Sequence, residues 1–208
     1  MSPHLIFGLV LLAVFCAFYL WQTPGLVRGG MKRDEVEHYL GEIEKNLAAL
    51  PQEDVTSLIE DLRRWGLADD GKPVYMLNLM RYYERLLPSS VVGNSPLTPA
   101  AANAHYEKSV MPLLLKNGDY PIFAGNVRDK NLVGHDPQAD DWSRILVIRY
   151  TSRRHFFRLV SNPAYGPFAP YKFASLHLDL VPTRLEIALP DMRLALGALL
   201  LLLYVLVG

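Results

Sequence analysis

An uninterrupted apolar run near the start of the chain, residues 5–21, constrains this sequence more than any other feature. About 17 apolar residues are just enough to cross the hydrocarbon core of a bilayer as a helix, and Tyr19 and Trp21 suit the interface at its end. A cleaved signal peptide is the alternative, but residues 1–4 contain no Lys or Arg and no small-x-small cleavage site follows the run. We therefore expect a membrane anchor and linker over residues 1–30, embedded in the lipid bilayer.

A second apolar run, residues 194–207, predicts a C-terminal membrane segment over residues 187–208. It contains about 14 residues, which is short for a full span. Positive charges lie on the inner flank of both runs: Arg28, Lys32, Arg33, Arg184 and Arg193. The positive-inside rule therefore predicts a protein of the inner (plasma) membrane whose central domain faces the cytoplasm.

Composition narrows the choice of partners. Half of the residues are hydrophobic, and the two ends of the chain hold the excess. The formal net charge of +0 gives no reason to expect nucleic acid as a partner. Cys16 is the single cysteine, so an intrachain disulfide is excluded.

Two amphipathic helices are expected between the anchor and the central domain, over residues 31–67. Apolar residues recur at three- and four-residue steps in the first helix, which Asp34 is expected to cap, and again in the second, residues 53–65. Packing against the domain or against each other is the simpler interpretation of both helices. Binding to the membrane or to a partner protein is the alternative.

Residues 72–82 (KPVYMLNLMRY) predict the first strand of the central domain. Because side chains alternate along a strand, both of its faces are mostly apolar, which is typical of a central strand. Asn78 and Arg81 are polar interruptions, one on each face. Each of them needs a partner or a ligand in such surroundings.

The central domain, residues 68–186, is predicted to be an α+β fold. After the first strand we expect a helix capped by Thr98, strands at 120–127 and 143–151, a helix capped by Ser152, and a strand at 177–185. This order is that of the ferredoxin-like βαββαβ arrangement, in which two helices cover one face of a four-stranded antiparallel sheet. The N-terminal helices and two terminal hydrophobic membrane helices are added to it.

Residues 67–185 resemble the dimeric α/β-barrel superfamily, in particular its bacterial branch of small uncharacterised proteins. The resemblance is carried by DDGKPVYMLNLMRY (residues 69–82), by the helix with Tyr106 and Pro112 followed by Gly118, and by WSRILVIRYTSRRHFF with NPAY after it. It implies a homodimer in which two sheets meet face to face, and a cavity between sheet and helices that often receives small organic molecules.

The resemblance does not select a function. The superfamily includes cofactor-independent monooxygenases, isomerases, haem-handling proteins and regulatory ligand-binding domains, so the fold alone leaves the activity open. The two apolar runs also depart from the soluble members. A substrate of a soluble relative is therefore not carried over to this chain.

Five residues are the candidates for binding a ligand: Asn78, Arg81, Tyr106, Arg149 and Tyr165. Near a cavity they would hydrogen-bond a carbonyl or a carboxylate, for which Arg149 is the best charge donor. The alternative is structural, with Tyr106 and Tyr165 as core aromatics and Arg149 in an ion pair across the sheet. His177 is also expected near the cavity, and His177 or Tyr106 would be the catalytic proton-transfer group of a cofactor-independent enzyme.

Other site chemistry has little support. No nucleophile elbow, phosphate-binding glycine loop, dinucleotide fingerprint or paired-cysteine motif occurs, so no cofactor is expected. A loop cluster comprises His135, Asp136, Asp140 and Asp141. Its spacing matches no familiar set of metal ligands, and we interpret it as a solvated turn, with no metal site expected.

Three functional hypotheses follow. The first is a membrane-anchored domain that faces the cytoplasm and binds a small hydrophobic molecule arriving from the bilayer. The second is a cofactor-independent monooxygenase or isomerase. The third is a non-catalytic subunit, in which the anchors and the helices between residues 34 and 65 serve assembly with another membrane protein.

Overall fold

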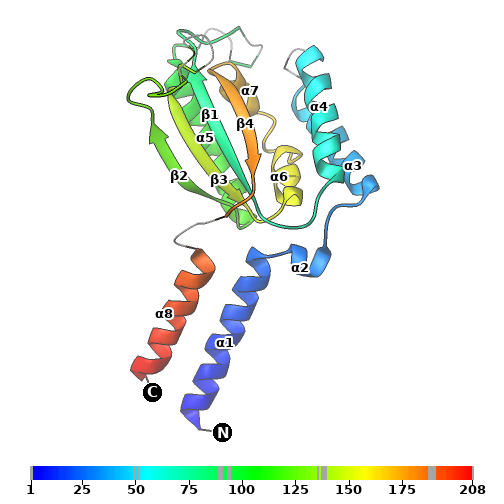
Figure 1. Cartoon of the computed structure of the whole chain (residues 1–208). Helices are drawn as coiled ribbons and strands as arrows, with labels where there is room; N and C mark the ends of the chain where they lie inside the picture. Colours follow the sequence, from blue (N-terminus) through cyan, green and yellow to red (C-terminus); the bar gives the residue numbers. More distant parts are fainter. Residues whose placement is uncertain are drawn as a thin grey trace.

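The computed structural model describes residues 2–48, 50, 52–88, 91–92, 95–134, 136, 140–186 and 191–207. A four-stranded antiparallel sheet carries helices on one of its faces, and two apolar helices project together from one end of this domain (Figure 1). The fold is therefore α+β, as the sequence predicts. The predicted domain boundary at residue 187 lies outside the described residues.

The sheet contains β1 (Val74–Tyr82), β2 (Tyr120–Asn126), β3 (Arg144–Tyr150) and β4 (Leu176–Thr183). Their order is β2-β3-β1-β4, and every neighbouring pair is antiparallel. The prediction that the first strand is central is confirmed, because β1 lies between β3 and β4. Its two apolar faces allow this position, whereas Pro182 lies in β4 at the edge of the sheet.

The helices α5 (Pro99–Lys116), α6 (Arg153–Val160) and α7 (Ala169–Phe173) cover one face of the sheet (Figure 1). The predicted cap of α5 is confirmed, since the Thr98 hydroxyl accepts a hydrogen bond of 3.2 Å from the backbone N–H of Ala101. The predicted side-chain cap of α6 is wrong. Ser152 precedes α6, but its buried hydroxyl makes no hydrogen bond within the described chain.

The two predicted amphipathic helices are α3 (Arg33–Asn46) and α4 (Gln52–Leu67), and they pack against each other and against α6. Val36 and Ile43 of α3 are fully buried in the same core as Phe157 of α6, which supports the interpretation of α3 and α4 as packing elements. The predicted cap of α3 differs: the helix begins at Arg33, before Asp34, and has no side-chain cap.

The apolar ends form α1 (Pro3–Gln22) and α8 (Met192–Val207), and a short helix, α2 (Gly25–Arg28), lies in the segment expected to be a linker. Within the described residues, only α1 is long and apolar enough to cross a membrane, a property that it shares with signal sequences. Of the two expected membrane helices, only α1 is therefore a candidate by length and composition. The 16 residues of α8 span about 24 Å, less than the thickness of a typical hydrocarbon core.

The helices α1 and α8 lie side by side and antiparallel (Figure 1). At their outer end the rings of His4 and Tyr204 stack with centroids 4.2 Å apart. At the end next to the domain, the guanidinium of Arg193 lies 5.5 Å from the centroid of the Tyr19 ring. The two helices therefore form a hairpin with the domain between them in sequence.

Candidate functional site

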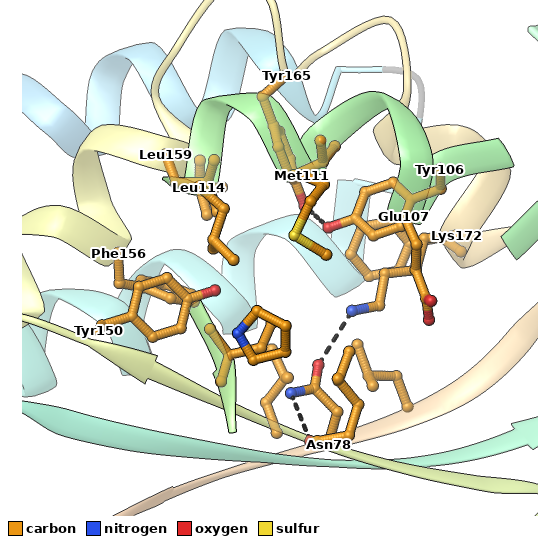
Figure 2. A pocket seen from close by; sticks show the side chains of 18 of the residues that line it. Asn78, Tyr106, Glu107, Met111, Leu114, Tyr150, Phe156, Leu159, Tyr165 and Lys172 are labelled. Atoms are coloured by element: carbon orange, nitrogen blue, oxygen red, sulfur yellow. Dashed lines mark hydrogen bonds between the residues drawn. The ribbon is translucent and has the colours of Figure 1, made fainter. Parts of the chain in front are cut away.

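A cavity of about 170 Å³ lies between the helix-covered face of the sheet and the helices above it (Figure 2). Most of its lining is apolar and comes from α5, β3 and α6: Val110, Met111, Leu114, Leu146, Ile148, Phe156 and Leu159. Polar atoms reach it from a few side chains only. An apolar cavity with a small number of placed polar groups is the usual form of a small-molecule site.

The polar centre of the cavity is a hydrogen bond between Lys172 of α7 and Asn78 of β1. The Lys172 ammonium donates to Asn78 Oδ1 at 3.1 Å, and both side chains are buried (Figure 2). Asn78 Nδ2 donates to the backbone carbonyls of Met76 at 3.0 Å and Leu146 at 3.2 Å. These two bonds fix the orientation of the amide, so Asn78 presents its carbonyl oxygen to Lys172.

Lys172 is a buried cation without an ion pair among the described residues. Burial lowers its pKa from 10.5 to about 8, and the charge of Glu107 opposes this shift. The ring of Tyr106 lies 5.1 Å from the ammonium and offers its negative face. The Glu107 carboxylate accepts hydrogen bonds from Arg144 Nη2 at 3.0 Å and from Asn103 Nδ2 at 2.9 Å, so it is engaged elsewhere.

Three tyrosines line the cavity: Tyr106, Tyr150 and Tyr165. The hydroxyl of Tyr106 donates to that of Tyr165 at 3.4 Å, and their rings meet edge to face. Burial raises the pKa of Tyr106 and of Tyr150 well above 10. At neutral pH these groups are neutral hydrogen-bonding partners, which does not favour Tyr106 as a proton-transfer group.

The structure brings together three of the five predicted binding residues, Asn78, Tyr106 and Tyr165. It places Arg149 and Arg81 on the opposite face of the sheet, so neither of them lines this cavity. The reason is the alternation of side chains along β1 and β3. Asn78 and Leu146 face the helices, whereas residues an odd number of positions away point to the other side.

Arg149 holds the end of α1. Its guanidinium is buried and donates to Gln22 Oε1 at 2.8 Å and to the Gln22 backbone carbonyl at 3.1 Å. Gln22 Nε2 in turn donates to the carbonyl of Gly118 at 3.0 Å. A cation is well placed at the C-terminus of a helix, where carbonyl groups lack partners. Arg149 therefore joins α1 to the sheet.

His177 also lies away from the cavity. Its side chain is 46 % exposed, and its Nε2 lies 3.2 Å from Asp179 Oδ1. In the sheet register it is opposite Arg81, on the face without helices. A catalytic role for His177 in this cavity has no geometric support.

A second buried polar cluster joins Asp119, Thr151 and His155 next to the end of α5. Asp119 accepts hydrogen bonds from the Thr151 backbone N–H at 2.8 Å and the Thr151 hydroxyl at 3.2 Å, and the same hydroxyl contacts His155 Nδ1. Burial raises the pKa of Asp119. Thr151 is fully buried, so this cluster ties β3 to α5 and α6 and offers no accessible nucleophile.

The loop that raised the question of a metal is partly outside the described residues, His135 included. Asp136 donates its backbone N–H to Asp140 Oδ2 at 3.1 Å, a local turn contact. In the portion of the chain that the structure describes, no group of three or more His, Cys, Asp or Glu side chains is arranged to hold a metal ion.

Lys172 is the functional candidate that the sequence did not indicate. It lies in the short segment APYKF, where one charged residue follows aromatic and small ones. A lysine in a surface turn looks the same in sequence, since its stem is apolar and its head is usually solvated. The only available signal was a lone charge inside an aromatic-rich stretch, between Tyr171 and Phe173.

Comparison with known proteins identifies the fold. No family model matches the chain, and neither does any curated protein. Similar solved structures include the RPA0582 protein of unknown function from Rhodopseudomonas palustris, at a TM-score of 0.51 with 20% identity over 67% of this chain and 98% of that chain. The methylated RPA0582 protein is also similar, at a TM-score of 0.50 with 20% identity over 69% of this chain and 97% of that chain. The resemblance to uncharacterised bacterial proteins is thus supported at the level of fold, and it brings no function.

Proposed function

We propose that the domain binds a small, largely apolar molecule in the cavity between the sheet and the helices. The observation that carries this proposal is the apolar cavity of about 170 Å³ with the Lys172–Asn78 pair at its polar centre. A buried ammonium that lacks an anionic partner is costly to keep in a purely structural core. A role in recognising a ligand accounts for its presence.

The cavity volume limits the ligand. An apolar cavity of about 150 Å³ holds benzene in another protein, and the cavity here, at about 170 Å³, is slightly larger. It therefore suits a molecule of the size of a substituted benzene. Because the lining is largely aliphatic and aromatic, burial of apolar surface would supply most of the affinity.

The route of entry is indicated by the partly exposed lining residues. Leu180 is 37 % exposed, and Glu107 and Arg144 each expose about a fifth of their side chains, at 22 %. The register places Arg144, Met80 and Leu178 in one row near the end of β1 that is far from α1 (Figure 1). This position favours entry from water over the expected entry from the bilayer.

The binding proposal can be tested by ¹⁹F NMR of the full chain in detergent micelles with 4-fluorotoluene as the probe. We expect a bound resonance, separate from the micellar one, for the wild type. Met111→Trp fills the cavity and should abolish it. Leu115→Trp is the matched control, because Leu115 lies on the same helix with half of its side chain exposed. Equal bound signals in both variants would reject the cavity as the site.

The membrane arrangement is a further part of the proposal. We infer that α1 and α8 enter the bilayer as an antiparallel hairpin and leave the domain at the cytoplasmic face. Close helix contact supports this: a Cβ atom added at Gly8 would lie 2.8 Å from the Tyr204 ring, and one added at Gly197 would lie 3.2 Å from the Phe15 ring. Small residues at such contacts are typical of helix pairs in membranes.

The finer fold assignment and the homodimer are also proposals. The strand order β2-β3-β1-β4, with α5, α6 and α7 on one face, supports the ferredoxin-like arrangement of a dimeric α/β barrel.

The other face of the sheet carries one apolar row across all four strands: Phe123, Val147, Leu77 and Val181. Phe123 is 54 % exposed. A second copy of the chain packing on this face would bury the row.

The two remaining hypotheses have less support. A cofactor-independent monooxygenase or isomerase that uses His177 or Tyr106 would need one of them ionisable beside the cavity. His177 lies away from the cavity, and burial raises the pKa of Tyr106, which lines it, well above 10. A subunit of a larger membrane assembly remains compatible with the α1–α8 hairpin. Co-purification of a stoichiometric partner, with no bound signal from the fluorinated probe, would favour this assembly role.

A further inference from the structure

We propose that Lys172 makes the cavity selective for small carboxylic acids, which it binds in the ionised form with the apolar part of the ligand buried. This inference rests on the proposed binding function and specifies the class of ligand. It follows from the hydrogen bonds that the Lys172 ammonium makes and from those that it leaves open.

The ammonium has three N–H donors. One of them is used by Asn78 Oδ1 at 3.1 Å, and the ring of Tyr106 interacts with the charge without accepting a conventional hydrogen bond. Within the described chain no further acceptor contacts the Lys172 ammonium. Because the group lines the cavity, its remaining donors are available to a ligand there. A carboxylate accepts two or more such bonds and neutralises the charge.

The protein's own carboxylate does not fill this role. Glu107 lines the same cavity, but Arg144 and Asn103 bind its two oxygens. The Glu107–Arg144 pair is thus internally neutral, and Lys172 is the net positive charge of the cavity wall. An anionic ligand is therefore complementary in charge, whereas a cationic ligand would meet Lys172 and be disfavoured.

A second polar group suits the same ligand. Tyr165 accepts the hydrogen bond from Tyr106 and lines the cavity. Its own hydroxyl proton has no acceptor among the described residues and remains for a ligand oxygen. A carboxylate with one apolar ring or branched chain thus matches both the polar centre and the volume of about 170 Å³.

The lysine also allows another chemistry, which the experiment must separate. A neutral amine condenses with an aldehyde or ketone to an imine, with loss of water, and burial that lowers the pKa of Lys172 to about 8 leaves a fraction of the amine neutral at pH 7. With a pKa of about 8 most of the group stays protonated at pH 7, and the Asn78 Oδ1 acceptor at 3.1 Å is complementary to that ammonium. We therefore assign carboxylate binding to this group.

The test compares three probes of similar size by ¹⁹F NMR with the full chain in uncharged micelles at pH 7: 4-fluorobenzoate, 4-fluorobenzamide and 4-fluorotoluene. We expect the wild type to bind 4-fluorobenzoate at least about tenfold more tightly than 4-fluorobenzamide, since a charge-assisted hydrogen bond is lost in the amide. Lys172→Met should lose this preference and still bind 4-fluorotoluene. Lys108→Met, an exposed position on α5, should behave as the wild type.

Two results would overturn the carboxylate assignment and leave the binding function intact. One is binding of 4-fluorotoluene by the wild type with no preference for 4-fluorobenzoate over the amide. The other is a preference that persists in Lys172→Met. Binding of none of the three probes would instead reject the binding function itself.

A pH titration of the wild type gives a second readout if Lys172→Met fails to fold. The charged or titratable groups that line the cavity with Lys172 are Glu107, Arg144 and three tyrosines: Tyr106, Tyr150 and Tyr165. Glu107 is paired with Arg144, and burial raises the pKa of all three tyrosines above 10. Affinity for 4-fluorobenzoate should therefore fall as Lys172 deprotonates above pH 8, while that for 4-fluorotoluene stays constant. Parallel profiles for the two probes, or covalent trapping of 4-fluorobenzaldehyde by borohydride without any carboxylate preference, would contradict the assignment.

Discussion

Lys172 has a buried ammonium, and this links the stability of the fold to pH. The folded-state pKa is about 8, against 10.5 for the free group. The unfolded chain therefore holds the proton more tightly, and unfolding is favoured wherever Lys172 is charged. The free energy of unfolding therefore rises as the pH increases from about 8 towards 10.5. For a lysine that gains an ion pair on folding, it would instead fall as the pH increases.

The prediction concerns the difference between the wild type and Lys172→Met, which cancels the titration of other groups. Between pH 7.5 and 9.5 the free energy of unfolding of the wild type should increase by about 2 kcal/mol relative to the variant, since one pKa unit corresponds to about 1.4 kcal/mol. Thermal unfolding at both pH values measures it. Lys108→Met serves as the control and should follow the wild type; a pH-independent difference for Lys172→Met would show that the ammonium is not desolvated.

Particular residues show how far the sequence predicts the site. Asn78, Tyr106 and Tyr165 were identified as a polar interruption in an apolar strand and as aromatics on the covering elements, and the structure places all three at the cavity. Arg149 was misplaced because strand alternation separates the two faces of β3 but does not say which face the helices cover. Lys172 was missed because its burial depends on long-range packing of α7 against α5 and β4, which no local pattern encodes.

At the scale of elements, the central link is the attachment of α1 to the sheet through Arg149 and Gln22. The buried guanidinium makes two hydrogen bonds to Gln22 at the last turn of α1, and Tyr120 covers it with its ring centroid 5.4 Å away. These buried hydrogen bonds attach the end of α1 rigidly to strand β3. The domain therefore cannot rotate freely about the anchor without breaking these bonds.

We expect Arg149→Met to remove this link and to destabilise the protein by about 3 kcal/mol, because each hydrogen bond to a charged group contributes about 1.5–3 kcal/mol. The midpoint of thermal unfolding should drop by roughly 6–12 °C for a chain of this size. Arg149→Lys should recover only part of the loss, since a single ammonium does not reproduce the planar fork of the guanidinium. Arg28→Met is the matched control at an exposed position; a midpoint for Arg149→Met equal to that of Arg28→Met would mean that the contact is not stabilising.

Elements were predicted better than their ends and caps. Apolar periodicity located β1 to β4, α3, α4 and α5, because burial on one face or both faces leaves a clear pattern in sequence. The short helix α2 was expected to be a linker, since Pro24 and Gly25 read as breakers although Pro also suits a helix start. Asp34 and Ser152 make no capping hydrogen bond in the structure. Their residue types can cap a helix, but whether they do so depends on local backbone geometry, which the sequence does not show.

At the scale of the whole molecule, the α1–α8 hairpin separates the two ends of the chain from the domain (Figure 1). If the hairpin crosses the bilayer, Ser2 lies on one side and the β2–β3 loop, where Leu132 is 96 % exposed, on the other. In a Cys16→Ser background, a membrane-impermeant maleimide applied to intact cells should label Ser2→Cys and spare Leu132→Cys until lysis. Labelling of Leu132→Cys in intact cells would place the domain outside, and protection of both positions would indicate a hairpin that does not cross.

The apolar outer face of the sheet sets the expected oligomeric state. Phe123, Val147, Leu77 and Val181 align across four strands, and Ile122 beside them is 43 % exposed, so a monomer would present a continuous apolar patch to water. A two-fold contact between two such faces would bury the same row from each copy. We therefore expect a dimer of this chain.

Native mass spectrometry of the detergent-solubilised chain tests this expectation. Phe123→Asp introduces one charge from each copy into that contact and should yield a monomer, because an unpaired carboxylate is strongly disfavoured in an apolar interface. Leu132→Asp adds the same charge to the exposed β2–β3 loop and should remain dimeric. A dimer that survives Phe123→Asp would locate the interface elsewhere. A monomeric wild type would contradict the prediction that a second copy covers this face.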